Sequence, residues 1–206
     1  MVAAVLLFGG SFDPIHHGHM IVARAAAEQL GVTRIILIPS AQPPHKLNAA
    51  RSPGADRLEL CRLAAGGDPL FEVSDWELRQ PGPNYTLLTV QHFRQQLGAD
   101  TPLCWLIGAD SLHELHTWYE VGTLAEICTL VTAARPGGPA ADFAALTALL
   151  SLDALARLRT HVLRTPLIEI SATEIRRRVR AGMSIRYLVP AAVADYIAAQ
   201  RMYRAD

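Results

Sequence analysis

Short, continuous hydrophobic runs alternate along the chain with segments whose apolar residues recur at helical spacing. Runs with few polar positions are typical of strands buried in a parallel sheet, and we expect strands at 3–8, 34–38, 70–73, 103–107, 126–132 and 167–170. Helical spacing predicts helices over 18–30, 55–65, 86–97 and 146–158, the last broken near 151–153, and two more that begin at Ala172 and Ala191. This alternation predicts an α/β fold, a doubly wound parallel sheet with helices on both faces and a C-terminal helical segment.

Composition and charge narrow the class of protein. We expect one domain over residues 1–206, with the helical segment at 171–206. Nineteen Lys and Arg residues balance nineteen Asp and Glu residues, which argues against a protein that coats nucleic acid. The three cysteines lie far apart and are expected as buried, reduced thiols. With no apolar run long enough to cross a membrane and no secretion signal, we expect a cytoplasmic protein with no membrane partner.

Three of the expected strands end in sequences suited to ligand contact. In parallel α/β sheets, ligands bind beyond the carboxyl ends of the strands. Gly9-Gly10 follows the first strand, Gly108-Ala-Asp110 follows a central strand, and Ser171-Ala-Thr173 follows the last. The functional site is therefore expected where these three segments meet.

The loop from Gly9 to His19 has the features of a phosphate-binding loop. Its glycines allow a ligand close to the backbone, and the following helix start offers N–H groups to an anion. His16 and His19 flank Gly18, so both imidazoles can point to one side and donate hydrogen bonds to phosphate oxygens. A strand–turn–helix with surface histidines and a metal-binding loop are the alternatives. We predict a nucleoside triphosphate site, with the neighbouring His17 as a bystander.

The segment from Ile170 to Arg176 has two interpretations. Ser171 and Glu174 have the spacing of a capping box, which any helix uses to satisfy its first N–H groups. In that case the arginines of 176–180 form an ordinary solvated basic face. Alternatively, the cap fixes the start of the helix, and Arg176, one turn in, reaches the phosphates of the bound triphosphate.

Taken together, the two segments resemble the two signatures of the HxGH nucleotidyltransferases. The first signature is matched from Gly10 to His19, and the second, ISxTxxR, is matched from Ile170 to Arg176. The resemblance implies a Rossmann-like fold and an ATP site. The residues that it implies for ATP binding are Gly9, Gly10, Ser11, Phe12, Gly18, His19, Gly108, Asp110, Ser171, Thr173 and Arg176.

Most of the chain is similar to the bacterial nicotinate-nucleotide adenylyltransferases. The matching segments are 43–46, 56–57, 76–77, 84–86, 106–111, 116–119, 135–137 and 189–197, whereas 138–164 is poorly matched. This similarity implies that Lys46 faces phosphate and contacts the acceptor nucleotide, and that Trp118 stacks on its pyridine ring. It also implies that Thr86, with backbone amides near Tyr119, receives the nicotinate carboxylate.

The implied reaction transfers AMP from ATP to nicotinate mononucleotide. The acceptor phosphate is already an anion, so positioning and charge stabilisation suffice, and this work falls to His16, His19, Lys46 and Arg176. Mg²⁺ is expected to arrive with ATP, without a dedicated protein metal site. Three alternatives remain: a nicotinamide mononucleotide adenylyltransferase, a phosphopantetheine adenylyltransferase, and a nucleotide-sensing or RNA-binding module that uses 176–180.

Overall fold

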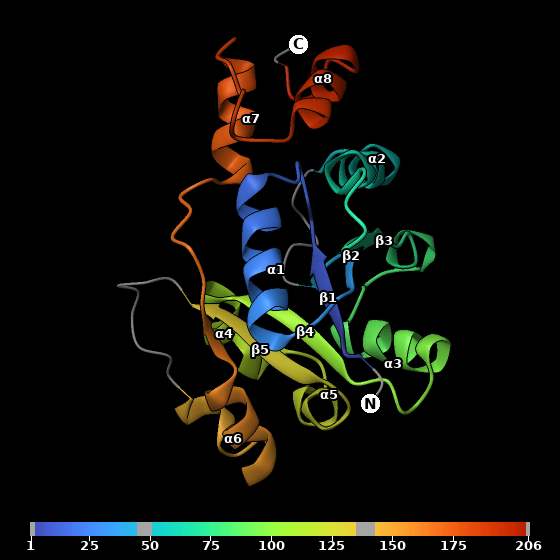
Figure 1. The fold of residues 1–206 in the computed structure, drawn as a ribbon, viewed down its shortest axis with the longest axis vertical. Coiled ribbons are helices and arrows are strands. Elements are labelled where there is room, and N and C mark those ends of the chain that lie inside the picture. Colours follow the sequence, from blue (N-terminus) through green and yellow to red (C-terminus); the bar gives the residue numbers. More distant parts are fainter. Residues whose placement is uncertain (1–2, 45–50, 135–142, 205–206) are drawn as a thin grey trace.

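Six parallel strands form the central sheet of the computed structural model, which describes residues 3–44, 51–134 and 143–204. The strands lie in the order β3-β2-β1-β4-β5-β6 (Figure 1), which is the strand order of a Rossmann fold. Their bounds are β1 Val5–Gly10, β2 Ile35–Pro39, β3 Phe71–Val73, β4 Leu103–Gly108, β5 Thr129–Ala134 and β6 Val162–Arg164. The predicted doubly wound parallel sheet is therefore confirmed.

Helices cover both faces of this sheet because successive strand residues point to opposite sides. Leu6 of β1 joins an apolar cluster with α1, α2, α7 and α8, whereas its neighbours Val5 and Leu7 join a second cluster with α3 to α6. The helices are α1 His17–Leu30, α2 Gly54–Ala65, α3 Thr86–Leu97, α4 Ala109–Glu114, α5 Val121–Ile127, α6 Leu152–Thr160, α7 Ala172–Arg180 and α8 Ala191–Ala199. Short 3₁₀ turns are η2 Glu77–Arg79, η3 Leu115–Thr117 and η4 Ala144–Leu146.

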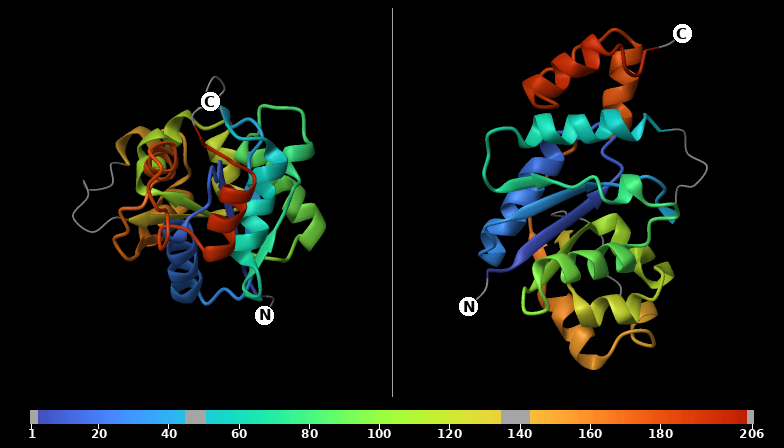
Figure 2. Two further views of the ribbon diagram at one scale, coloured as in Figure 1. Left: turned by 90° about the horizontal axis from the view of Figure 1, so that it is seen from above. Right: turned by 90° about the vertical axis from the view of Figure 1, so that its right-hand side faces the viewer.

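The C-terminal helices sit at one end of the molecule. Figure 1 and Figure 2 show α8 beside α2 and α7 beyond the start of α1, with α6 at the opposite end. Ile175 of α7 and Val193 of α8 are fully buried, and the N–H of His17 donates to the carbonyl oxygen of Leu188 at 3.0 Å. The helical segment therefore packs against the loop that opens α1.

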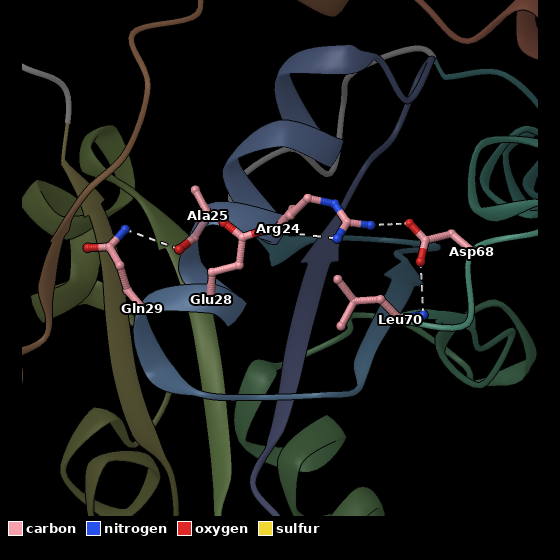
Figure 3. A network of polar contacts seen from close by, with 6 residues as sticks. All are labelled: Arg24, Ala25, Glu28, Gln29, Asp68 and Leu70. Atoms are coloured by element: carbon pink, nitrogen blue, oxygen red, sulfur yellow. Dashed lines mark hydrogen bonds and ion pairs between the residues drawn. The ribbon is translucent and has the colours of Figure 1, made fainter.

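A surface network connects the second half of α1 to the loop before β3. Arg24 pairs with Asp68, and Asp68 Oδ1 accepts a hydrogen bond from the N–H of Leu70 at 3.0 Å (Figure 3). Arg24 also approaches Glu28, one helical turn on, at 4.0 Å. Because the side chains are substantially exposed, such pairs contribute on the order of 0–1 kcal/mol each.

Two predicted strands were misplaced. Helix α5 runs to Ile127, and the N–H of Cys128 caps it by donating to Leu124, so the strand expected at 126–132 begins only at Thr129. The apolar turn of the helix adjoins the strand without a glycine or proline between them, which hides the boundary.

The last strand of the sheet is 162–164 and not 167–170. β6 pairs with β5 from Val162 to Arg164, and the chain beyond is irregular, with Leu167 about half exposed. Pro166 supplies no N–H and cannot continue the ladder. Of the helix predicted over 146–158, only the part after the predicted break forms, as α6 capped by Ser151, whereas the part before it is the 3₁₀ turn η4 and non-helical residues.

No helix among the described residues is long and apolar enough to cross a membrane. The three cysteines, Cys61, Cys104 and Cys128, are buried and free, as expected. Burial raises the pKa of the Cys104 thiol to about 11, so it stays protonated and unreactive near neutral pH.

Candidate active site

A cleft of about 760 Å³ opens at the carboxyl ends of β1 and β4. These two strands pair with each other at the centre of the sheet. From β1 the sheet continues through β2 to β3 on one side, and from β4 it continues through β5 to β6 on the other. Folds of this kind bind ligands at this point, where the strand order reverses its direction. The lining comes from the strand ends, the first loop, the start of α3 and the segment after α4. It comprises Phe8, Gly9, Gly10, Ser11, His19, Ser40, Pro43, Pro44, Glu77, Asn84, Tyr85, Thr86, Trp105, Leu106, Ile107, Gly108, Ser111, Glu114, Thr117, Trp118 and Tyr119.

Gly9 is required at the end of β1 by a close aromatic contact. A Cβ atom at this position would lie 2.6 Å from Cζ2 of Trp105, which is closer than real Cβ contacts. Trp105 belongs to β4, is almost fully buried and contributes to the wall of the cleft. The missing side chain therefore lets a rigid indole form the wall beside the first loop.

One ring nitrogen of His19 accepts a hydrogen bond from the backbone, and the other is available to donate one to a ligand. The backbone N–H of His16 donates to His19 Nδ1 at 3.2 Å, so Nδ1 carries no proton and the neutral ring carries its proton on Nε2. Because His19 lines the cleft, it presents an N–H donor beside Gly10 and Ser11. This is the arrangement that a phosphate oxygen requires.

The two histidines of the motif lie against each other. Their ring centroids are 3.7 Å apart and the ring planes differ by 23°. Burial is the main cause that lowers the pKa of His16 to about 4, and repulsion from His17 is the second cause. Burial is also the main cause that lowers the pKa of His19 well below its usual value, and repulsion from His16 is the second cause. Both rings are therefore neutral near pH 7.

His16 itself is nearly buried and lies behind His19, outside the cleft lining. Its Nδ1 has no hydrogen-bond partner among the described residues and lies 3.0 Å from where a Cβ on Gly18 would stand. Phe12 and Gly18 are also buried and outside the lining. Their predicted contacts with ATP stay predictions.

The other end of the cleft is aromatic and begins at the first turn of α3. Tyr85 and Tyr119 lie with ring centroids 4.6 Å apart, and Trp118 lines the same region. The N–H groups of Leu88 and Thr89 donate to the Tyr85 carbonyl oxygen, at 3.0 and 3.3 Å. Helix geometry leaves the preceding N–H groups, from Thr86 onward, without intrahelical partners. Thr86, Trp118 and Tyr119, expected to hold the acceptor, are therefore brought together.

Glu77, Asn84 and Thr89 form a buried polar cluster beside the aromatic end of the cleft, and this cluster was not predicted from the sequence. The carboxylate of Glu77 accepts a hydrogen bond from Thr89 Oγ1 at 2.6 Å. Asn84 Nδ2 donates to the Glu77 carbonyl, and Asn84 Oδ1 accepts from the N–H groups of Ala41 and Gln42. Asn84 therefore fixes the loop after β2 to the wall of the cleft. The motif positions 76–77 and 84–86 were the available signal, but they did not show which groups would be buried.

Glu77 predicts a pH-dependent stability. Burial raises its pKa to about 7, so the folded state loses stability as the pH rises from about 4.5 to 7. We expect Glu77→Gln, which keeps an acceptor for Thr89, to remove this loss, on the order of 3 kcal/mol. The free energy of unfolding of both proteins at pH 5 and pH 8 measures it. The variant should gain on the wild type toward pH 8, and a difference that does not change with pH would contradict the assignment.

The second motif is placed beside the first loop and outside the cleft lining. Ser171 caps α7, with its Oγ accepting from the N–H of Glu174 at 3.2 Å, so the capping interpretation is confirmed for that bond. Arg176 Nη1 donates to the carbonyl oxygen of Asp13 at 2.7 Å, and Nη2 to Thr173 Oγ1 at 3.3 Å. Arg176 is thus bound by part of its guanidinium to the loop between β1 and α1, and its contact with phosphate stays a prediction.

Of the remaining predicted residues, one lines the cleft and the side chains of the others fall outside the described part of the structure. Gly108 lies at the exposed end of β4 and lines the cleft. Asp110 lies in α4, but its side chain is outside the described part of the structure, as are Lys46 and the segment 135–137. Within the described residues, no group of three His, Cys, Asp or Glu side chains is placed to hold a metal ion.

Comparisons with known proteins agree with this geometry. A family model described as cytidylyltransferase-like matches residues 7–178. A probable nicotinate-nucleotide adenylyltransferase of Thermomicrobium roseum is 43% identical over 198 residues, which are 96% of this chain and 90% of that protein. One from Yersinia pestis is 39% identical over 209 residues, covering 96% and 94%. The structure of a Plasmodium falciparum nicotinic acid mononucleotide adenylyltransferase complexed with NaAD superposes with a TM-score of 0.71 at 17% identity, covering 98% and 97%, and shows a shared fold.

Proposed function

Because this chain belongs to the nicotinate-nucleotide adenylyltransferase family, we infer that it transfers AMP from ATP to nicotinate mononucleotide. The products are nicotinate adenine dinucleotide, also called deamido-NAD, and pyrophosphate. The observation that carries this inference is the neutral His19 donor at the glycine-rich end of β1, inside a cleft whose other end is aromatic.

The two ends of the cleft suit the two substrates. At the end of β1, the proposed ATP phosphates lie along Gly9, Gly10 and Ser11, with His19 beside them. Gly108 at the end of β4 lies on the proposed nucleoside side. The pyridine ring of the acceptor then occupies the aromatic region, against Trp118.

The chemistry needs no general base. An oxygen of the acceptor phosphate attacks the α-phosphorus of ATP, and the bond between that phosphorus and the β-phosphate oxygen breaks to release pyrophosphate. His19 Nε2 donates a hydrogen bond to the charge that develops there, with His16 holding its ring. Lys46 and Arg176 complete the proposed phosphate contacts, and Arg176 is already bound to Asp13 of the loop. ATP is proposed to enter with Mg²⁺ held mainly by its phosphates and water.

Turnover tests this function directly. With MgATP and nicotinate mononucleotide, we expect pyrophosphate to be released in proportion to the acceptor consumed, with nicotinate adenine dinucleotide as the second product. Reactions without an acceptor, and with phosphopantetheine as acceptor, serve as controls and should show no release above background. Equal release without nicotinate mononucleotide would indicate simple ATP hydrolysis and would contradict the proposal.

A further inference from the structure

The phosphate loop contains one turn in an unfavourable backbone conformation. Phe12 has φ +46°, in the left-handed region that bulky residues rarely adopt, and its side chain is 2% exposed. Its ring packs edge-on against the ring of His19, with centroids 5.1 Å apart and planes at 85°. The Phe12 ring is therefore one of the contacts that fix the His19 ring, and this turn must be held by its surroundings.

Two arginines bind backbone carbonyl groups just before and just after Phe12. Arg57 Nη1 donates to the carbonyl oxygen of Ser11, and Arg176 Nη1 donates to that of Asp13, both at 2.7 Å. Arg57 is 2% exposed, and its Nε also donates to the carbonyl oxygen of Ser52, at 3.1 Å. Hydrogen bonds from a guanidinium are stronger than neutral ones, so they can offset the cost of the left-handed turn.

The side chain of Asp13 ties the same turn to the end of the chain. Asp13 Oδ1 accepts from the Tyr203 hydroxyl at 2.7 Å, and Oδ2 accepts from the N–H of Ser52 at 3.1 Å. Asp13 is 6% exposed, so both oxygens lie in a shielded environment. Burial and the nearby Asp13 carboxylate raise the pKa of Tyr203 far above its usual value, so the hydroxyl remains a donor.

We propose that Arg57 and Tyr203 are positioning residues for the transfer reaction, acting through Phe12 on His19. The proposal rests on the proposed function, because it assumes that His19 stabilises charge during adenylyl transfer. Arg57 fixes the carbonyl before the turn, and Tyr203 fixes the carboxylate after it. The C-terminal segment thereby reaches the chemistry without lining the cleft.

Tyr203→Phe tests the proposal because it removes only the hydroxyl. We expect kcat to fall about tenfold, with the KM of either substrate changing less than about threefold, since Tyr203 lies outside the cleft lining. Tyr196→Phe is the matched control. It removes a similar bond, from Tyr196 to Asp56 Oδ1 at 3.0 Å, that ties the C-terminal segment to α2 instead of to Asp13. The control should leave kcat unchanged, even if both variants lower Tm.

A double-mutant cycle identifies the route of the effect. In a His19→Ala background, Tyr203→Phe should lower kcat less than about twofold, because no ring is left to position. Arg57→Lys keeps the positive charge but not the guanidinium geometry that reaches the carbonyl oxygens of both Ser11 and Ser52. Its effects on kcat, alone and in the His19→Ala background, should match those of Tyr203→Phe. A wild-type kcat for Tyr203→Phe would overturn the proposal. So would equal losses of kcat in the two tyrosine variants, or a full tenfold loss in the His19→Ala background. An inactive wild type would instead contradict the proposed function.

Discussion

Replacing His19 by alanine is expected to lower kcat at least about a hundredfold. The imidazole offers a preorganised donor at the end of β1, and loss of one such donor typically costs two to three orders of magnitude. The donor is the Nε2–H, since Nδ1 is occupied by the N–H of His16. The ring is neutral because of burial, so the kcat of the wild type should not depend on titration of His19 between pH 6 and 8.

Two further variants separate chemistry from folding. His19→Gln can place an amide N–H near the position of Nε2 and should retain more activity than His19→Ala. His17→Ala removes the third imidazole of the loop, which lies outside the cleft lining, and this variant should keep a near-normal rate. Steady-state kcat with saturating MgATP measures all three. A near-normal kcat for His19→Ala would reduce this histidine to a structural role.

Nicotinate mononucleotide is expected to exceed its nicotinamide analogue in kcat/KM by about thirtyfold or more. At the aromatic end of the cleft, the start of α3 offers backbone N–H groups at Thr86, which suit a carboxylate. The amide of the analogue is neutral and presents an NH₂ group of its own to such donors. Exchanging a charge-assisted hydrogen bond for a neutral one costs about 2 kcal/mol, which corresponds to about thirtyfold.

Within the described lining, this preference has to come from neutral donors, which include the backbone N–H groups at the start of α3 and the Thr86 hydroxyl. The acidic side chains there are Glu77 and Glu114, and no lysine or arginine is among the described lining residues. Initial rates at several concentrations of each acceptor, with the same enzyme and MgATP, measure the ratio. Equal kcat/KM values would contradict recognition of the carboxylate at α3.

The sheet and the position of the cleft were predictable because both follow from local patterns. Apolar runs located β1, β2 and β4, and glycines marked the strand ends that meet at the cleft. The boundary at Cys128 and the position of β6 were not predictable in this way. One lacks a helix-ending residue, and the other depends on Pro166 and on pairing with β5.

The support of the site depends on contacts between distant parts of the chain. Tyr203 and Asp13 are 190 residues apart, and their hydrogen bond follows from how α7 and α8 pack beside the first loop. Local spacing carries no information about such a contact. The same holds for Glu77, whose pKa is raised by the tertiary packing around it rather than by any neighbour in sequence.

The central claim is that the AMP group of ATP moves to the acceptor phosphate. The most direct test uses ATP labelled at the α-phosphate, with nicotinate mononucleotide and Mg²⁺, and separates the products. We predict that all transferred label appears in nicotinate adenine dinucleotide and none in pyrophosphate. Label recovered as free AMP without the dinucleotide, or a dinucleotide that carries no label, would contradict adenylyl transfer by this protein.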